Sequence, residues 1–254
     1  MLRIFFISLW CIAIFSVSVI AHIPATFALN YFSKQVAQFG QVEGVSGTIW
    51  HGQADRVTVQ GQQLGALQWQ VKPSALFMAR VEADIRFGRG SAIDLHGRGT
   101  VGYGISGPYA HQFVASIPAA YVMTQLPMPI PIEALGQVEL TMHDYQFEQP
   151  YCTSAEGSVA WAAGELTTPV GPILLGPVIA DITCQDSQWQ VSGALESTQV
   201  SGEFSASLES NNRYQSQGWF KPGTEFPSIL SSQLSLVGEP DNQGRYQLSQ
   251  NGRF

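Results

Sequence analysis

Apolar and polar residues follow two different patterns along this chain. From Leu2 to Ala21 almost every residue is apolar, and Arg3 carries the only charge. About 20 apolar residues in a helix are enough to cross a bilayer, so the pattern predicts one membrane-spanning helix at residues 2–21. The apolar core of a cleaved signal peptide is normally only ~7 to 15 residues long, which favours an uncleaved anchor. Because Val19-Ile20-Ala21 fits a cleavage site, cleavage stays open as the alternative.

After residue 45 the pattern changes to short alternating segments bounded by glycine. These segments are rich in β-branched and aromatic residues, which is typical of antiparallel strands. We expect strands at 45–50, 53–60, 62–71, 80–87, 91–104 and 110–117. One helical turn is expected at 73–78, and Pro24 is well placed in the first turn of a short helix. The fold class is therefore mainly β.

Several segments of the second half resemble segments of the first half in the same order. Residues 117–121 repeat the pattern of residues 23–27, and Gly157–Trp161 resembles Gly47–Trp50. A second short helix is therefore expected after Pro118. We predict an anchor (1–22) followed by two similar β units, 23–116 and 117–254, each led by a short helix and stacked on one core face. Chance similarity between glycine-rich strands is the alternative.

Charge and composition narrow the partners and the topology. Only 12% of the residues are charged, the formal net charge is −7, and no run of Lys or Arg is present. Nucleic acid is therefore not an expected partner. Because Arg3 lies at the very start of the apolar segment and Lys34 is the first basic residue after it, we expect the N-terminus in the cytoplasm and the β domain outside it.

Two cysteines belong to the expected β domain. Cys11 lies in the apolar segment, which leaves Cys152 and Cys184. An oxidising compartment permits one disulfide between them, worth about 3 to 4 kcal/mol in the chain-entropy model. Two buried free thiols are the alternative.

No catalytic or metal-binding pattern is evident. The five histidines are His22, His51, His96, His111 and His143. They are far apart in the sequence and lack the H-E-x-x-H spacing of a zinc-binding helix. Residues 97–102 match G-x-G-x-x-G, but glycine and proline follow where a dinucleotide fold needs a helix, so we expect a strand there. No nucleophile elbow or phosphate-binding loop occurs. We expect no enzyme activity, metal, cofactor or small-molecule substrate.

Five tryptophans lie on the expected strands or beside them. They are Trp50, Trp69, Trp161, Trp189 and Trp219. Their apolar neighbours favour core positions, and a stacking platform for sugars or bases is the alternative.

The order of certain motifs resembles one known family. The run GVSGTIWHG at 44–52, with Gly65 and Trp69 after it, resembles the opening signature of the type II secretion system protein N family. The resemblance continues through the residues around Cys152 and Cys184 to Gly244-Arg245-Tyr246. The signature residues in this chain are Gly47, Trp50, Gly52, Gly65, Trp69 and Gly157.

The resemblance implies a non-catalytic inner-membrane protein with a periplasmic domain, whose partners are other components of the secretion machinery that exports folded proteins. It supplies no catalytic residues. A scaffold or assembly role is the function we expect, with docking through strand edges or loop surfaces. The alternative is a periplasmic β groove that binds or transfers lipid.

Overall fold

The computed structural model describes residues 2–31, 40–124, 132–169 and 171–253. The chain divides into two compact units, residues 1–96 and 97–254. Each unit is a sheet of antiparallel strands, as the alternating pattern predicted. The repeat expected between 23–116 and 117–254 is a separate matter and stays a prediction.

Unit 1 begins with two helices, α1 (Leu2–Ala21) and α2 (Ala25–Tyr31). The short helix expected after Pro24 is thereby confirmed. Within the part of the chain that the structure describes, no helix is both long and apolar enough to cross a bilayer. The expected span includes positions 2–9, 13 and 17, whose side chains lie outside the described part.

The sheet of unit 1 has the strand order β1-β3-β4-β5, and β2 pairs with β3. The bounds are β1 Gln41–Glu43, β2 Ser46–Gly47, β3 His51–Val59, β4 Gln62–Val71 and β5 Val81–Arg89. Helix α4 (Pro73–Leu76) is the helical turn expected before β5. The strand expected at 45–50 is much shorter than predicted, because Thr48 and Ile49 contact the chain at Ile23 and Pro24 instead of continuing along β3.

Unit 2 contains the longer strands of the molecule. Its bounds are β6 His96–Gly104, β7 Gly107–Pro118, α5 Ala119–Thr124, β8 Glu133–Leu135, β9 Gln137–Gln146, β10 Ser154–Thr168, β11 Gly171–Gln185, β12 Gln188–Glu196, β13 Val200–Leu208, β14 Arg213–Pro222, α6 Ser228–Ser231, η1 Leu234–Leu236 and β15 Tyr246–Arg253. Helix α5 is the second short helix predicted after Pro118. Strand β6 begins five residues later than the segment predicted at 91–104, because the Ser91 hydroxyl accepts hydrogen bonds from the amides of Ile93 and Leu95 and forms a turn.

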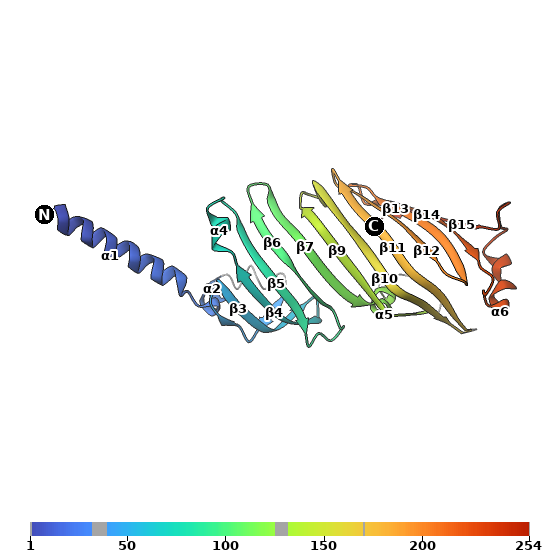
Figure 1. The fold of residues 1–254 in the computed structure, drawn as a ribbon, viewed down its shortest axis with the longest axis horizontal. Helices are drawn as coiled ribbons and strands as arrows, with labels where there is room; N and C mark the ends of the chain where they lie inside the picture. The colour runs from blue at the N-terminus through green and yellow to red at the C-terminus, as the bar shows by residue number, and fades with distance from the viewer. Residues whose placement is uncertain (1, 32–39, 125–131, 170, 254) are drawn as a thin grey trace. The chain divides into compact units, whose positions relative to one another are not determined.

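The strands of unit 2 follow one another in sequence order, β6-β7-β9-β10-β11-β12-β13-β14-β15, with β8 paired to one end of β10 (Figure 1). Most neighbouring strands are joined by short turns, whereas β7 and β9 are joined through α5 and β8, and β14 and β15 through α6 and η1. Bulges interrupt the register of β10 near Trp161 and Gly164. They let β10 bend and pair with both β9 and β8.

The described residues do not form a hydrophobic core between two packed layers. The buried apolar side chains are Ala25, Ala54, Ala75, Tyr109, Ala119, Ala134, Met142, Cys152, Ala155, Ala180, Cys184 and Val200. No described Leu, Ile, Phe or Trp is buried, although these residues normally fill the space between two packed layers. The sheet of unit 2 is therefore one layer over most of its extent.

Candidate interaction surfaces

The register of unit 2 separates its side chains into two chemically distinct faces. On β12 the residues alternate between exposed and half-buried, and the half-buried ones are Trp189, Val191, Gly193 and Leu195. The pairing places them in rows with equivalent residues of the neighbouring strands. One face is thus apolar over many strands.

We define the apolar face by the aligned residues of β9 to β15. It comprises Val138, Leu140, Met142, Tyr145, Ala155, Gly157, Val159, Trp161, Val178, Ala180, Ile182, Cys184, Trp189, Val191, Gly193, Leu195, Gly202, Phe204, Ala206, Leu208, Tyr214, Ser216, Gly218, Phe220, Tyr246, Leu248, Gln250 and Gly252. No position in this set carries a charged side chain.

Glycines on the apolar face lie beneath large side chains of adjacent strands. A methyl group at Gly193 would meet the ring of Phe204, and one at Gly252 would meet the ring of Tyr214. The aromatic side chains therefore lie flat across the glycines. They become half-buried against their own sheet, without a second layer.

The opposite, polar face holds a shallow hollow of about 590 Å³ over β11 to β15. Its lining includes Asp181, Ser192, Glu203, Ser205 and Gln217, and the indole of Trp219 lies in the same hollow. These groups offer many hydrogen-bond donors and acceptors but no cluster of positive charge. The polar face is suited to hydrogen bonding with a partner, and the apolar face is not.

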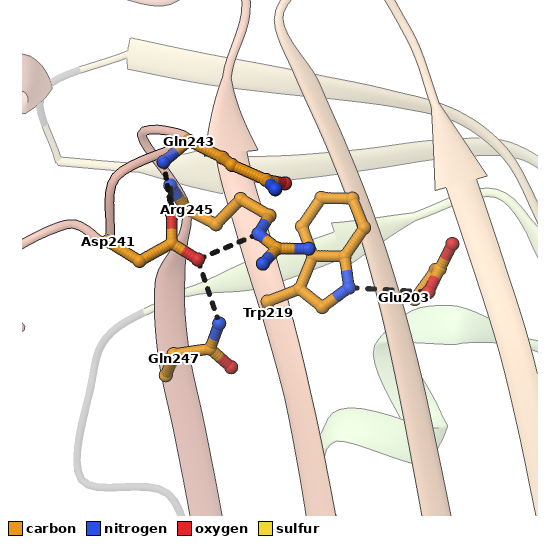
Figure 2. Close-up of polar contacts among 6 residues, drawn as sticks. All are labelled: Glu203, Trp219, Asp241, Gln243, Arg245 and Gln247. Atoms are coloured by element: carbon orange, nitrogen blue, oxygen red, sulfur yellow. Dashed lines mark hydrogen bonds and ion pairs between the residues drawn. The ribbon is translucent and has the colours of Figure 1, made fainter.

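The loop before β15 is fixed to the polar face by Asp241 (Figure 2). Asp241 Oδ1 accepts hydrogen bonds from the amides of Gln243 (2.8 Å) and Arg245 (2.9 Å), and its Oδ2 accepts one from Arg245 Nε (2.8 Å). The backbone hydrogen bond from Arg245, helped by the Arg245 side chain and the Gln243 amide, lowers the pKa of Asp241 from 3.8 to about 2. The carboxylate therefore stays charged and holds the loop over most of the pH range.

Arg245 in turn covers Trp219. Its guanidinium carbon lies 5.3 Å from the centre of the indole ring, and Trp219 Nε1 donates a hydrogen bond to Glu203 (3.3 Å), as Figure 2 shows. A cation over an indole face is a favourable arrangement. The sequence analysis missed this cluster, whose only signal was the Asp241–Arg245 spacing at the end of a polar loop.

The expected disulfide between Cys152 and Cys184 is present. Both residues are almost fully buried, and Phe113, Leu140, Tyr145 and Trp189 pack around them with Met142 and Ala155. The disulfide joins the loop between β9 and β10 to the apolar face at Cys184.

Four of the signature residues come together in unit 1. Gly52 lies beneath the indole of Trp69, whose Nε1 donates to the Ile49 carbonyl (3.2 Å). Trp50 Nε1 donates to the Ile20 carbonyl at the end of α1 (2.9 Å), and Gly47 has a positive φ of 87°. Together they join the end of α1 to the first strands.

The two other signature residues lie elsewhere. Gly65 has a φ of 89° at an irregular point in the pairing of β3 with β4, and Gly157 in unit 2 lies beneath Met142. In these positions the signature residues serve chain geometry.

The residues considered as candidates for catalysis, metal binding or nucleotide binding are dispersed over the chain. His22, His51, His96 and His143 are exposed, and His111 pairs with Asp144. The described residues contain no group of three or more side chains suited to hold a metal ion. Residues 97–102 lie within β6, as predicted, with Gly99 beneath Phe113.

None of the five tryptophans expected in the core is buried. All five are half-buried against their own unit's sheet. Trp161 donates to the Leu135 carbonyl (2.7 Å), and Trp189 stacks on Tyr145 at 6.1 Å between ring centres. The expectation failed because alternation shows which side chains share a face, and does not show whether another layer covers it.

Comparison with known proteins gives one consistent result. The family described as "Type II secretion system (T2SS), protein N" matches residues 40–249. The "Type II secretion system protein N" of Vibrio cholerae serotype O1 is 48% identical over 237 residues, which is 93% of each chain. The protein of that name from Aeromonas hydrophila is 32% identical over 91% of each chain, and that from Pectobacterium carotovorum is 25% identical over 84%. No solved structure matches.

Proposed function

The chain belongs to the type II secretion system protein N family, and from this membership we propose that it is a non-catalytic component of the type II secretion system that docks other proteins of that machinery. The observation that carries the proposal is the extent of the likeness, 48% identity over 93% of a relative that bears this name. The polar chemistry described above contains no arrangement that suggests a reaction. A structural role is therefore the simpler reading.

In this proposal residues 2–21 anchor the chain in the inner membrane, with the N-terminus in the cytoplasm and residues 40–254 in the periplasm. The length of α1, 20 residues with Arg3 as its only charge, supports an anchor. The disulfide supports a periplasmic domain, because such bonds persist in oxidising compartments. The hydrogen bond from Trp50 to Ile20 would hold the β domain next to the bilayer.

We further propose that β15 is the docking edge. It ends the strand order of unit 2, and among the described strands it pairs only with β14. Its eight residues contain no Pro or Lys, and those at 247–251 are exposed. Natural edge strands are usually protected by such residues or by being short. An extended segment of a partner can add to β15 through backbone hydrogen bonds.

The edge of unit 1 is less suited to strand addition. Strand β1 is three residues long, and Glu43 at its end forms an ion pair with Arg56 (2.8 Å). A three-residue edge offers too few outward amides and carbonyls for a stable added strand. This contrast supports β15 as the docking edge.

Affinity purification of the full chain from native envelopes tests the proposal. At native abundance, other type II secretion proteins should be enriched over a control purification from cells without the tagged chain. A topology assay with a membrane-impermeant thiol reagent should label Ser249→Cys only after the outer membrane is opened. If no type II secretion protein is enriched, the proposal is wrong.

A further inference from the structure

We propose that the apolar face of unit 2, over β10 to β14, binds the acyl chains of membrane phospholipid. This inference goes beyond protein docking and concerns the opposite face of the sheet, which has few hydrogen-bonding side chains. It is independent of whether β15 is the docking edge.

Large apolar side chains on this face are only half-buried. Val191, Leu195 and Phe204 are examples, and Leu248 on β15 is 51% exposed. A soluble domain normally buries such a contiguous set against a second layer, and large exposed apolar patches mark binding sites. A bound ligand or partner would therefore be needed to bury these apolar side chains fully.

Three short helices of the described chain pack elsewhere. Helices α2 and α4 contact strands of unit 1, and α5 contacts β7 and β8. The loop that carries Cys152 covers only the end of the face at Cys184 and Trp189. The rows through Ile182, Val191 and Ala206 and through Val178, Leu195 and Phe220 stay half-buried.

The chemistry of the face favours hydrocarbon over a protein surface. A protein interface of standard size carries about ten direct hydrogen bonds. Over β10 to β14 the polar groups of the face are the hydroxyls of Ser216 and Tyr214 and the indole N–H groups of Trp161 and Trp189, and no side chain is charged. A protein surface of ordinary polarity would have to bury its own polar groups there without compensation. Acyl chains have no such groups.

The dimensions of the face also fit acyl chains. From β10 to β14 there are four strand spacings of ~4.8 Å, or about 19 Å. One leaflet of a bilayer has a hydrocarbon depth of about 15 Å, half of the ~30 Å core, which is the reach of one acyl chain. An acyl chain can thus lie across these strands, with its headgroup in solvent beyond the rim.

Phospholipid is the source we infer, and this step rests on the proposed function, in which residues 2–21 anchor the chain in a membrane. The aromatic rings of Phe204 and Tyr214 lie over Gly193 and Gly252 and leave a smooth surface instead of deep pockets. Such a surface suits chains of varied length and saturation, and it does not suit one specific ligand.

Photolabelling of the full chain tests the proposal. The chain is reconstituted in vesicles of phosphatidylethanolamine and phosphatidylglycerol that contain a trace of phosphatidylethanolamine with a diazirine on its acyl chain, then extracted in mild detergent, illuminated and mapped by mass spectrometry. We expect label on the apolar face of β10–β14 in addition to residues 2–21. The label on residues 2–21 serves as an internal reference for membrane contact.

Paired variants separate the two faces. Val191→Glu with Leu195→Glu places charges on the apolar face and should reduce label on residues 154–222 by about tenfold relative to residues 2–21, since contacts to large apolar side chains are lost. Ser192→Glu with Ala194→Glu adds the same charges to exposed positions of the polar face, on the same strand, and should leave the label unchanged. Formation of the disulfide reports whether each variant folds.

Three results would overturn the proposal. One is wild-type label confined to residues 2–21. Another is label spread equally over both faces. The third is an unlabelled apolar face with crosslinks between Val191 positions of two copies, which would make the face a dimer interface. Because the wild-type map needs no variant, misfolding of a variant does not remove the test. A negative photolabelling result does not bear on the proposed role in secretion, which the affinity purification tests separately.

Discussion

Gly193 on β12 lies directly beneath the phenyl ring of Phe204 on β13, and a methyl group at Gly193 would lie 2.5 Å from Phe204 Cζ and 2.7 Å from Ala180 Cβ. The two residues are paired across the strands, so the ring fills the space that a side chain would otherwise occupy. This relationship allows a one-layer sheet to half-bury its aromatic side chains.

Gly193→Ala should therefore destabilise unit 2. The new methyl group must displace Phe204 or shift β13, which typically costs about 1 to 3 kcal/mol. Urea unfolding followed by circular dichroism measures the change in the free energy of unfolding. Ser192→Ala on the polar face is the matched control, with an effect within about 0.5 kcal/mol. Equal stability of Gly193→Ala and wild type would show that Phe204 does not depend on the glycine.

Loss of the disulfide should destabilise unit 2 as well. Cys152→Ala releases the loop over the apolar face, with an expected loss of about 3 to 4 kcal/mol for a loop of this length. Urea unfolding with and without reductant gives the value, and Cys11→Ser, at an exposed cysteine of α1, is the control that should change nothing. Non-reducing peptide mapping should recover Cys152 linked to Cys184. Two alkylated thiols at these positions would contradict the structure.

The loop before β15 should loosen in acid. The pKa of Asp241 is lowered to about 2, so its contribution to stability is present above its ordinary value near 3.8 and is lost as the pH falls toward 2. Wild type should exceed Asp241→Asn in stability at pH 7, and the difference should shrink between pH 4 and pH 2. Thermal unfolding across this range provides the measurement. A difference that stays constant with pH would mean that the Asp241 charge does not hold the loop.

The sequence predicted much of this fold from local pattern. Alternation placed β3, β4 and β5 nearly in full, Pro24 and Pro118 marked short helices, and the count of two cysteines outside the apolar segment predicted their pairing. These features depend on neighbours in the chain. The order of motifs also identified the family. Its glycines and tryptophans are residues that the geometry of the first strands requires.

Features that depend on distant contacts were not predictable. The tryptophans were expected in a core, but alternation cannot reveal that the sheet of unit 2 is a single layer. The bulges that bend β10 near Trp161 and Gly164 leave no pattern in a single sequence. The cluster of Asp241, Arg245 and Trp219 forms only when the loop folds back over β14.

The measurement that most directly tests the docking account is cysteine crosslinking at the edge of β15 in native envelopes. In a Cys11→Ser background, Ser249→Cys on β15 should crosslink to another type II secretion protein, whereas Ser192→Cys, exposed on the polar face of the interior strand β12, should not. The account predicts an adduct that requires both the edge cysteine and the intact secretion machinery. An adduct that forms equally from Ser192→Cys, or none from Ser249→Cys while secretion continues, would contradict it.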